Sequence, residues 1–329
     1  MDIEPAEDLP GFPTGSTSDH SFPKGVCTAV LREVQNSDGG WAFRPEGQSR
    51  VEPTCWAVKA LTALAHADNA DELIIRRGLD FLTRAQLADG SWSAAPGEKT
   101  GCWVTSLACW ILIAMGDEKY AKAVAAGLRW VCDDWPRDST WWRRSIRKLS
   151  AAGRYAKQND VYRGWAWTPG TSSWVEPTAF ALLALENQDL VRGDLNAPAA
   201  TRRKLGEALL YDRMCPGGGW NCGNPEVYGV PGEALVIPTT WALLALRHYP
   251  DRRENKESLA WMENNFTKIR GQASYALARI CLAVYDRQYE MRAANADDDR
   301  DSVRSVQVLA WMSLAAGNPR QWLTARTSL

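Results

Sequence analysis

The chain lacks any hydrophobic stretch long enough to cross a membrane. It has 329 residues, and none of its apolar runs reaches the ~18 uninterrupted residues that a transmembrane helix needs. Residues 1–23 are acidic and polar and hold four prolines, without the basic start and apolar stretch of a signal peptide. We therefore expect a cytoplasmic protein whose first 23 residues form a tail or a strap over the folded part.

The sequence also lacks a large excess of acidic or basic residues, and it has few residues in metal-binding patterns. The 38 basic and 39 acidic residues leave a net charge of -1, so we expect no nucleic-acid partner, which requires a clearly basic surface. There are only three histidines and no CxxC pair, which argues against the common zinc sites. Most of the eight cysteines lie in apolar stretches, where a reduced thiol packs as a small hydrophobic group.

The sequence is instead rich in tryptophan, with 17 residues, and in internal repeats. The phrase QNSDGGW at 35–41 returns as QLADGSW at 86–92. A second phrase, VEPTCWAVKAL at 51–61, returns as VEPTAFALLAL at 175–185 and as VIPTTWALLAL at 236–246. Repetition at a period of about 50 residues indicates a repeat architecture.

The second phrase predicts the start of a buried helix. Proline suits the first helical turn, a preceding glutamate suits the helix dipole, and the residues that follow are apolar nearly all round. Aligning on one Thr or Ser position predicts six inner helices, at Thr54, Thr105, Thr178, Thr239, Ser274 and Ser302. Amphipathic stretches predict six outer helices, at about 24–34, 75–84, 118–131, 201–214, 253–266 and 286–294.

These helices predict an all-α fold, an (α/α)6 toroid of six helical hairpins with an inner and an outer layer. An open superhelix of hairpins fits the same repeat. We expect one toroid domain over 24–316, followed by a C-terminal tail at 317–329. An insertion at about 136–164 is basic and aromatic, and it fits either a solvated helix or a lip that meets an anionic head group or a membrane surface.

The QxxDGxW phrase is expected at the ends of outer helices. Its Asp-Gly pair turns the chain, because glycine adopts the left-handed conformation that ends a helix. The glutamine and the tryptophan are expected to tie this turn to the neighbouring hairpin, so we interpret them as structural.

These repeats resemble those of the squalene cyclase, terpenoid cyclase and protein prenyltransferase superfamily, over about residues 25–316. The resemblance implies an α/α toroid that binds a small hydrophobic substrate in a central aromatic cavity. Class II cyclases of this superfamily carry a DxDD motif whose middle aspartic acid protonates an alkene or epoxide. This sequence has no DxDD, and its nearest stretch is NADDDRDS at 295–302, where the acid position falls on Asp297 or, aligned on the helix start, on Arg300.

Four carboxyls are therefore candidate catalytic acids: Asp297, Asp298, Glu176 and Glu52. Glu52 and Glu176 occupy the equivalent place before their inner helices, so they are expected at the same end of the ring as the 297–301 cluster. Carboxyls at one mouth of an apolar cavity can have raised pKa values and act as acids. The same residues fit helix-start carboxylates that face solvent.

Aromatic residues near the inner-helix starts are candidate substrate-binding walls, because their faces stabilise carbocations by roughly 0.5–2 kcal/mol each. Core packing between the helix layers accounts for them equally well. The candidate substrate-binding residues are Trp56, Trp103, Phe180, Trp241, Tyr275 and Arg300.

The zinc site of the prenyltransferases is not expected, since no histidine follows an Asp-x-Cys in this sequence. No resident cofactor is expected, and magnesium enters only if the substrate carries a diphosphate. We expect a terpenoid-cyclase-like enzyme, an isomerase or lyase that starts its reaction with an acid. The alternatives are a non-catalytic isoprenoid-binding toroid, a scaffold subunit, or a zinc-independent prenyltransferase-like protein; peripheral membrane contact and oligomeric state stay open.

Overall fold

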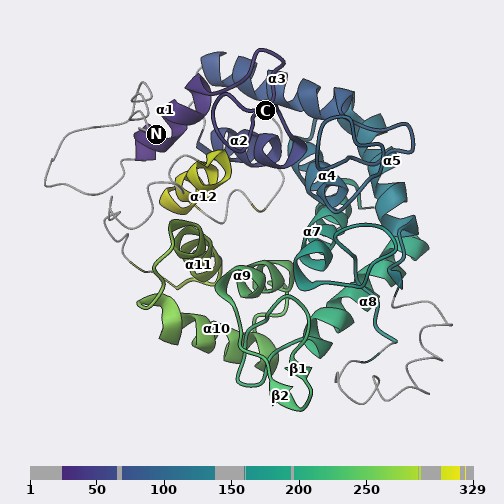
Figure 1. The fold of residues 1–329 in the computed structure, drawn as a ribbon, viewed down its shortest axis with the longest axis vertical. Coiled ribbons are helices and arrows are strands. Elements are labelled where there is room, and N and C mark those ends of the chain that lie inside the picture. The colour runs from purple at the N-terminus through teal and green to yellow at the C-terminus, as the bar shows by residue number, and fades with distance from the viewer. Residues whose placement is uncertain are drawn as a thin grey trace, which may run out of the picture.

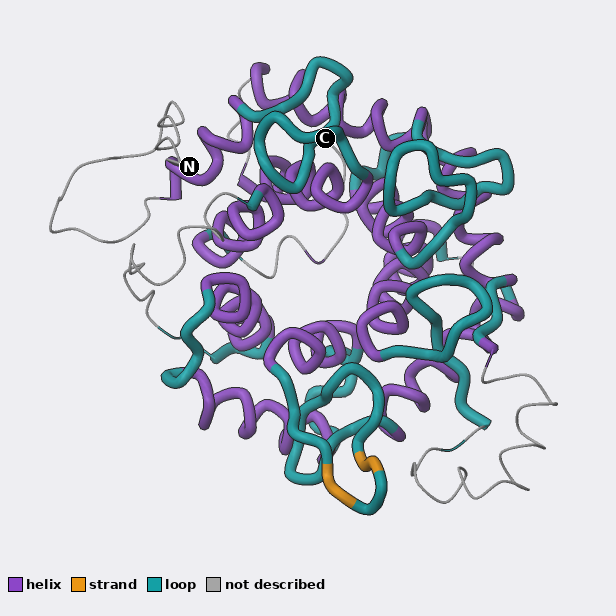
Figure 2. The backbone as a smooth tube through the Cα atoms, viewed as in Figure 1, coloured by secondary structure: helices purple, strands orange, loops and turns teal. Residues whose placement is uncertain are grey.

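The chain folds into two concentric layers of helices around one axis (Figures 1 and 2). The computed structural model describes residues 24–64, 69–137, 159, 161–193, 196–287, 289, 305–318 and 323. The inner layer consists of α2 (Val51–Leu64), α4 (Val104–Ala114), α7 (Val175–Arg192), α9 (Val236–Ala245), α11 (Gln272–Val284) and α12 (Val306–Ala316).

The outer helices surround the inner ring (Figure 1). A small β-hairpin precedes α9. Within the described residues the outer helices are α1 (Lys24–Glu33), α3 (Asn69–Arg84), η1 (Glu118–Tyr120) with α5 (Ala121–Asp133), α8 (Ala197–Asp212) and α10 (Arg253–Phe266). The hairpin is β1 (Glu226–Val227) paired antiparallel with β2 (Val230–Pro231). None of these described helices is long and apolar enough to cross a membrane.

The inner layer is a closed ring, as the all-α toroid prediction required. In ring order, α2 contacts α4, α4 contacts α7, α7 contacts α9, α9 contacts α11, and α11 contacts α12, which returns to α2. The contact between α12 and α2 excludes the open superhelix. It also places α2 opposite α9 and α7 opposite α12 across the axis.

Two of the predicted helices differ from the structure at the C-terminal end of the ring. The inner helix predicted from Ser302 is described only from Val306, and Ser302 lies outside the described residues. An outer helix cannot begin at Asp286, because this residue follows the end of α11 with a φ of 62°, a left-handed conformation incompatible with an α-helix. Most of the predicted 286–294 stretch lies outside the described residues.

The QxxDGxW turns bind the two layers together, as their predicted structural role required. The glutamine reaches the neighbouring hairpin as predicted, whereas the tryptophan indole bonds to its own outer helix. The Gln35 amide donates to the carbonyl of Ile74, in the outer helix of the next hairpin, at 2.9 Å. The Trp41 indole N–H donates to the carbonyl of Leu31, in its own outer helix, at 2.7 Å. The second copy repeats both bonds, from Gln86 to Ala123 and from Trp92 to Leu82.

The threonine of the second phrase explains why the two phrases recur together. The backbone N–H of Trp41 donates to Thr54 Oγ1 at 2.9 Å, so the inner helix holds the turn that precedes it. The same bond joins the tryptophan and the threonine of three further repeats, with Trp92 and Thr105, Trp165 and Thr178, and Trp220 and Thr239. The buried threonine is the fourth residue of α2, α7 and α9 and the second of α4. It therefore faces the turn and not the axis.

Candidate active site

The starts of α2, α4, α7, α9 and α12 place side chains around one mouth of the ring, which we call the mouth layer. It consists of Glu52, Trp103, Glu176, Ile237 and Gln307, all of which are partly exposed. Glu52, Glu176, Ile237 and Gln307 are the second residues of their helices. Side chains at equivalent positions of a repeat point in the same direction. These side chains therefore lie at the same height along the ring axis.

One helical turn deeper lies a layer of rings that we call the aromatic floor. It consists of the sixth residues of α2, α7, α9 and α12, namely Trp56, Phe180, Trp241 and Trp311. These four side chains are between 0% and 6% exposed. The side chains of the mouth layer are partly exposed, whereas those of the aromatic floor, one helical turn further in, are buried. Solvent that enters at the mouth therefore reaches no deeper than these rings.

The rings of the aromatic floor meet across the axis. Trp56 of α2 and Trp241 of the opposite helix α9 stack with centroids 5.3 Å apart and planes 30° apart. Phe180 lies 6.1 Å from Trp56 and 4.8 Å from Trp241. Trp311 lies 5.6 Å from Trp56 and 6.1 Å from Trp241. Trp56, Phe180 and Trp241 therefore fill the axis at this depth, and their contact with a substrate stays a prediction.

The other two aromatic candidates lie in different places. Trp103 is at the mouth, with its ring 5.0 Å from that of Trp167 and 5.2 Å from that of Phe180. Tyr275 is buried and its ring lies 5.2 Å from that of Phe266 of α10, so it packs between the inner and outer layers. The reason is register: Tyr275 is the fourth residue of α11, the position that faces away from the axis in the other repeats.

Glu52 is a carboxyl held in place at the mouth. The side-chain amide of Gln307 donates to Glu52 Oε1 at 2.8 Å, across the closing contact between α12 and α2. Burial raises the pKa of Glu52 to about 7, and the charge of Glu176 adds to the rise, while the hydrogen bond from Gln307 opposes it. Glu52 therefore holds its proton up to near-neutral pH.

Glu176 is the second mouth carboxyl, and burial raises its pKa to about 7 as well. No ion pair to Glu176 is found within the part of the chain that the structure describes. The charge of Glu176 raises the pKa of Glu52, and both carboxyls titrate near neutral pH. The arrangement is thus a proton donor above a layer of aromatic rings.

The remaining predicted site residues, Asp297, Asp298 and Arg300, lie outside the described residues. The described site contains two residues that the sequence reasoning missed, Gln307 and Trp311. The signal was available, since Gln307 follows Val306 as Glu52 follows Val51 and Glu176 follows Val175. Aligning the last repeat on Ser302 hid this correspondence.

Metal-binding side chains do not gather in the described part of the chain. Over those residues, no group of three or more His, Cys, Asp or Glu side chains is close enough to hold an ion. His248 lies at the opposite end of the ring, where it contacts Glu186 beside Arg247. Cys222, the cysteine nearest to the prenyltransferase pattern, is exposed at the start of α7, where its carbonyl accepts the N–H of Val175.

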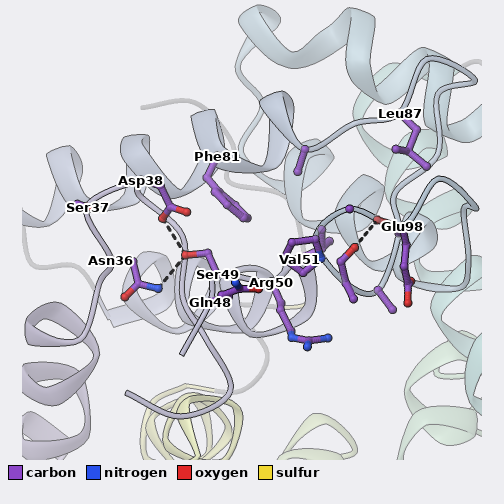
Figure 3. A pocket seen from close by; sticks show the side chains of 16 residues that line it. Asn36, Ser37, Asp38, Gln48, Ser49, Arg50, Val51, Phe81, Leu87 and Glu98 are labelled. Carbon is purple, nitrogen blue, oxygen red and sulfur yellow. Dashed lines mark hydrogen bonds between the residues drawn. The ribbon is translucent and has the colours of Figure 1, made fainter. Parts of the chain in front are cut away.

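A surface cleft of about 590 Å³ lies off the axis, between the segments 36–51 and 93–98 (Figure 3). Its polar groups belong mainly to the first QxxDGxW turn, where Asp38 accepts hydrogen bonds from Ser49 Oγ and from the backbone N–H of Gly40. Arg50 and Glu98 extend to one side of the cleft in Figure 3. Glu52 and Glu176 are not among the residues that line this cleft.

Comparison with known proteins supports the fold. No family model matches the chain. A segment of 89 residues is 36% identical to drimenyl diphosphate synthase from Streptantibioticus cattleyicolor. That segment covers 27% of this chain and only 16% of the synthase, so the likeness concerns a small part of that enzyme.

Solved structures match over most of the chain. A variant of the type II terpene cyclase MstE from Scytonema, in complex with geranylgeranyl dihydroxybenzoate, aligns with a TM-score of 0.54 at 14% identity, over 88% of this chain and 76% of that one. MstE without ligand gives 0.51 at 16% identity, over 88% and 78%. A glycosidase variant gives 0.52 at 9% identity, over 92% and 96%. The chain therefore has the α/α toroid fold of the type II terpene cyclases, as its repeats predicted, and shares that fold with enzymes of other chemistry.

Proposed function

We propose that the protein is a terpenoid-cyclase-like enzyme that protonates an acyclic isoprenoid at the mouth layer and so starts a cyclisation or rearrangement. Glu52 and Glu176 are the proposed acids. The observation that carries the proposal is the pair of carboxyls with pKa values near 7 one turn above four aromatic rings. The segment shared with drimenyl diphosphate synthase supports an isoprenoid as the substrate class.

The proposed step moves one proton from a carboxyl oxygen to a carbon of the substrate. Gln307 donates to Glu52 Oε1, which leaves Oε2 to carry the transferable proton. The π electrons of the alkene form the new C–H bond, and the neighbouring carbon becomes a carbocation. The new carboxylate attracts this cation strongly because the site is partly desolvated, and the partly exposed ring of Trp103 adds a cation–π attraction. Loss of a proton from the cyclised cation restores the acid.

No resident cofactor is part of this proposal, because the proton donor is a side chain. Magnesium would be needed only for a diphosphate substrate, so the test is run both with and without Mg²⁺. The glycosidase neighbour supports a second assay, since glycoside hydrolysis also uses a pair of carboxyls. The drimenyl diphosphate synthase segment favours the isoprenoid over the sugar.

The test is product formation from geranyl, farnesyl and geranylgeranyl diphosphates and from squalene, with and without Mg²⁺, analysed by gas chromatography and mass spectrometry. We expect cyclic products whose yield falls above pH ~7, as the acid ionises. Glu52→Gln should lower turnover by about 10²-fold or more, and Glu176→Gln should also lower it. The surface variant Glu254→Gln is the control and should be fully active.

Three outcomes separate the alternatives. Turnover that survives in both Glu52→Gln and Glu176→Gln contradicts the acid assignment and moves attention to Asp297→Asn and Asp298→Asn. Isoprenoid binding without any product favours the non-catalytic binding protein. Prenyl transfer to an added acceptor, without ring formation, favours the prenyltransferase-like alternative.

A further inference from the structure

The surface cleft next to the mouth layer has no part in the proposed proton transfer. It has a volume of about 590 Å³, and apolar side chains such as Val51, Phe81 and Leu87 form much of its lining. Val51 immediately precedes Glu52 in α2, so the cleft and the mouth layer are neighbours at the start of this helix. A volume of this size is typical of pockets that hold small molecules.

Arg50 lies between the cleft and the mouth. Its side chain lines the cleft, and its Cζ lies 5.9 Å from the centre of the Phe43 ring. The carbonyl of Phe43 accepts the N–H of Val306 at 3.0 Å. Val306 precedes Gln307, the residue that donates to Glu52. The guanidinium is therefore held near the closing contact of the ring, and Figure 3 shows it extending from the cleft toward the side on which α12 lies.

The fold does not require an arginine at this position. The backbone N–H of Arg50 donates to the carbonyl of Trp41, and Trp174 and Leu235 make the same backbone bond to the tryptophans of their own repeats. Each of them stands directly before its inner helix. Among the described residues, no carboxylate pairs with the guanidinium of Arg50, which contacts the ring of Phe43. The charge of this side chain is thus available to a ligand.

A guanidinium at the edge of a largely apolar cleft suits an anion that carries an apolar chain. Its planar set of N–H donors matches the oxygens of a carboxylate or a phosphate. Two carboxylates also line the cleft. Asp38 accepts hydrogen bonds from Ser49 and Gly40, whereas Glu98 is exposed and extends to the same side as Arg50 (Figure 3). Glu98 is therefore the group that opposes an anion at Arg50.

We propose that Arg50 and the cleft form a head-group site, in which Arg50 binds the anionic head of an isoprenoid, a carboxylate or a diphosphate, while the chain enters the mouth. This inference rests on the isoprenoid class of the proposed function, but not on turnover. A chain that forms rings folds back on itself. Its head can therefore be held at Arg50 while one of its double bonds meets the carboxyl of Glu52.

The test compares farnesyl diphosphate, farnesoic acid and farnesol, which share one chain and differ in the charge of the head. Binding is measured by isothermal titration calorimetry in a Glu52→Gln background without Mg²⁺, so that no turnover alters the ligand and no metal masks its charge. We expect at least one of the two anions to bind about tenfold tighter than farnesol or better, and the tighter anion identifies the head group.

Arg50→Gln should weaken the binding of that anion about tenfold, which corresponds to about 1.4 kcal/mol, and should leave the binding of farnesol unchanged. Arg50→Lys, which keeps the charge, should restore part of the loss. Glu98→Gln should strengthen the binding of the anion roughly twofold, because it removes a like charge from the rim.

Arg76→Gln is the matched control, because it also removes one positive charge. Arg76 lies on α3, where it pairs with Glu72, and it does not line the cleft. The variant should leave the ratio of anion to farnesol affinity unchanged. Circular dichroism checks the folding of each variant.

The proposal is overturned if farnesol binds as tightly as both anions. It is also overturned if a folded Arg50→Gln variant keeps the preference for the anion, or if Arg76→Gln lowers that preference as much. A preference that depends on Arg50, together with no cyclic product from the unmodified chain, would sustain this inference while the proposed catalysis fails. No binding of any of the three ligands would overturn both.

Discussion

Replacing Glu52 by glutamine should stabilise the protein at alkaline pH, although it removes a proposed catalytic group. Glutamine has nearly the same shape, and its carbonyl oxygen can still accept the hydrogen bond from Gln307. What the substitution removes is the cost of holding a negative charge in a partly desolvated place beside Glu176. The difference in stability between the variant and the unmodified chain therefore measures the cost of the negative charge at this position.

The magnitude follows from the pKa of Glu52, which burial raises from its ordinary 4.5 to about 7. One pKa unit corresponds to about 1.4 kcal/mol, so the ionised carboxyl costs the folded protein at most about 3 kcal/mol. A carboxyl whose pKa is raised by folding stabilises the fold below its unfolded pKa. That contribution is lost as the pH rises through the folded pKa, so the window runs from about pH 4.5 to 7.

The assay is urea unfolding at pH 5 and at pH 8, followed by tryptophan fluorescence and compared with the unmodified chain. At pH 5 the two free energies of unfolding should differ by less than about 1 kcal/mol, because this pH lies near the lower end of that window. At pH 8 Glu52→Gln should be the more stable by about 1–3 kcal/mol.

Glu254→Gln serves as the control with the opposite sign. The side chain of Arg252 holds the pKa of Glu254 below its ordinary value, so loss of this charge should not stabilise the fold at pH 8. If Glu52→Gln is no more stable than the unmodified chain at pH 8, the carboxyl is well solvated and the reasoning behind the proposed acid is refuted.

Two further predictions test the turns that hold the ring. Gly39→Ala should destabilise the protein by more than Gly97→Ala. Both glycines have positive φ values, 90° and 82°. A Cβ at Gly39 would lie 2.6 Å from the carbonyl oxygen of Arg77, whereas a Cβ at Gly97 would have no atom within 4 Å. Equal melting temperatures would show that the contact can relax. Thr54→Val should lose about 1–3 kcal/mol in urea unfolding, because it leaves the buried N–H of Trp41 without its acceptor; Thr54→Ser, which keeps the hydroxyl, should restore most of it, and an unchanged midpoint in Thr54→Val would contradict this role.

The local parts of the structure were open to prediction because their causes are local. The Pro-Thr phrase and its apolar continuation predicted the inner helices, and α10 begins and ends at the predicted residues, Arg253 and Phe266. The structural role of Gln35 and Trp41 followed from a turn that recurs with the same spacing. The depth of Glu52 and Glu176 at one mouth followed from their equivalent places in the repeat.

The errors concern the last repeats, where the pattern weakens. Taking Ser302 as the start of the last inner helix hid both Gln307 and Trp311, which match Glu52 and Trp56 once the helix begins at Val306. Tyr275 was expected near the axis for the same reason, although its position in α11 corresponds to that of Thr54 in α2.

The sequence by itself determined the unit of this fold: a turn, an inner helix and an outer helix repeated until the set could close. It also determined which residue types stand at each position, because spacing within one repeat fixes their depth along the axis. Only the tertiary structure decided what meets across the ring. The bond between Gln307 and Glu52 spans 255 positions, and the stack of Trp56 on Trp241 joins opposite helices. Whether side chains of a given size leave a hollow or fill it depends on the radius of the closed ring, and that radius is set by the packing of all six inner helices together.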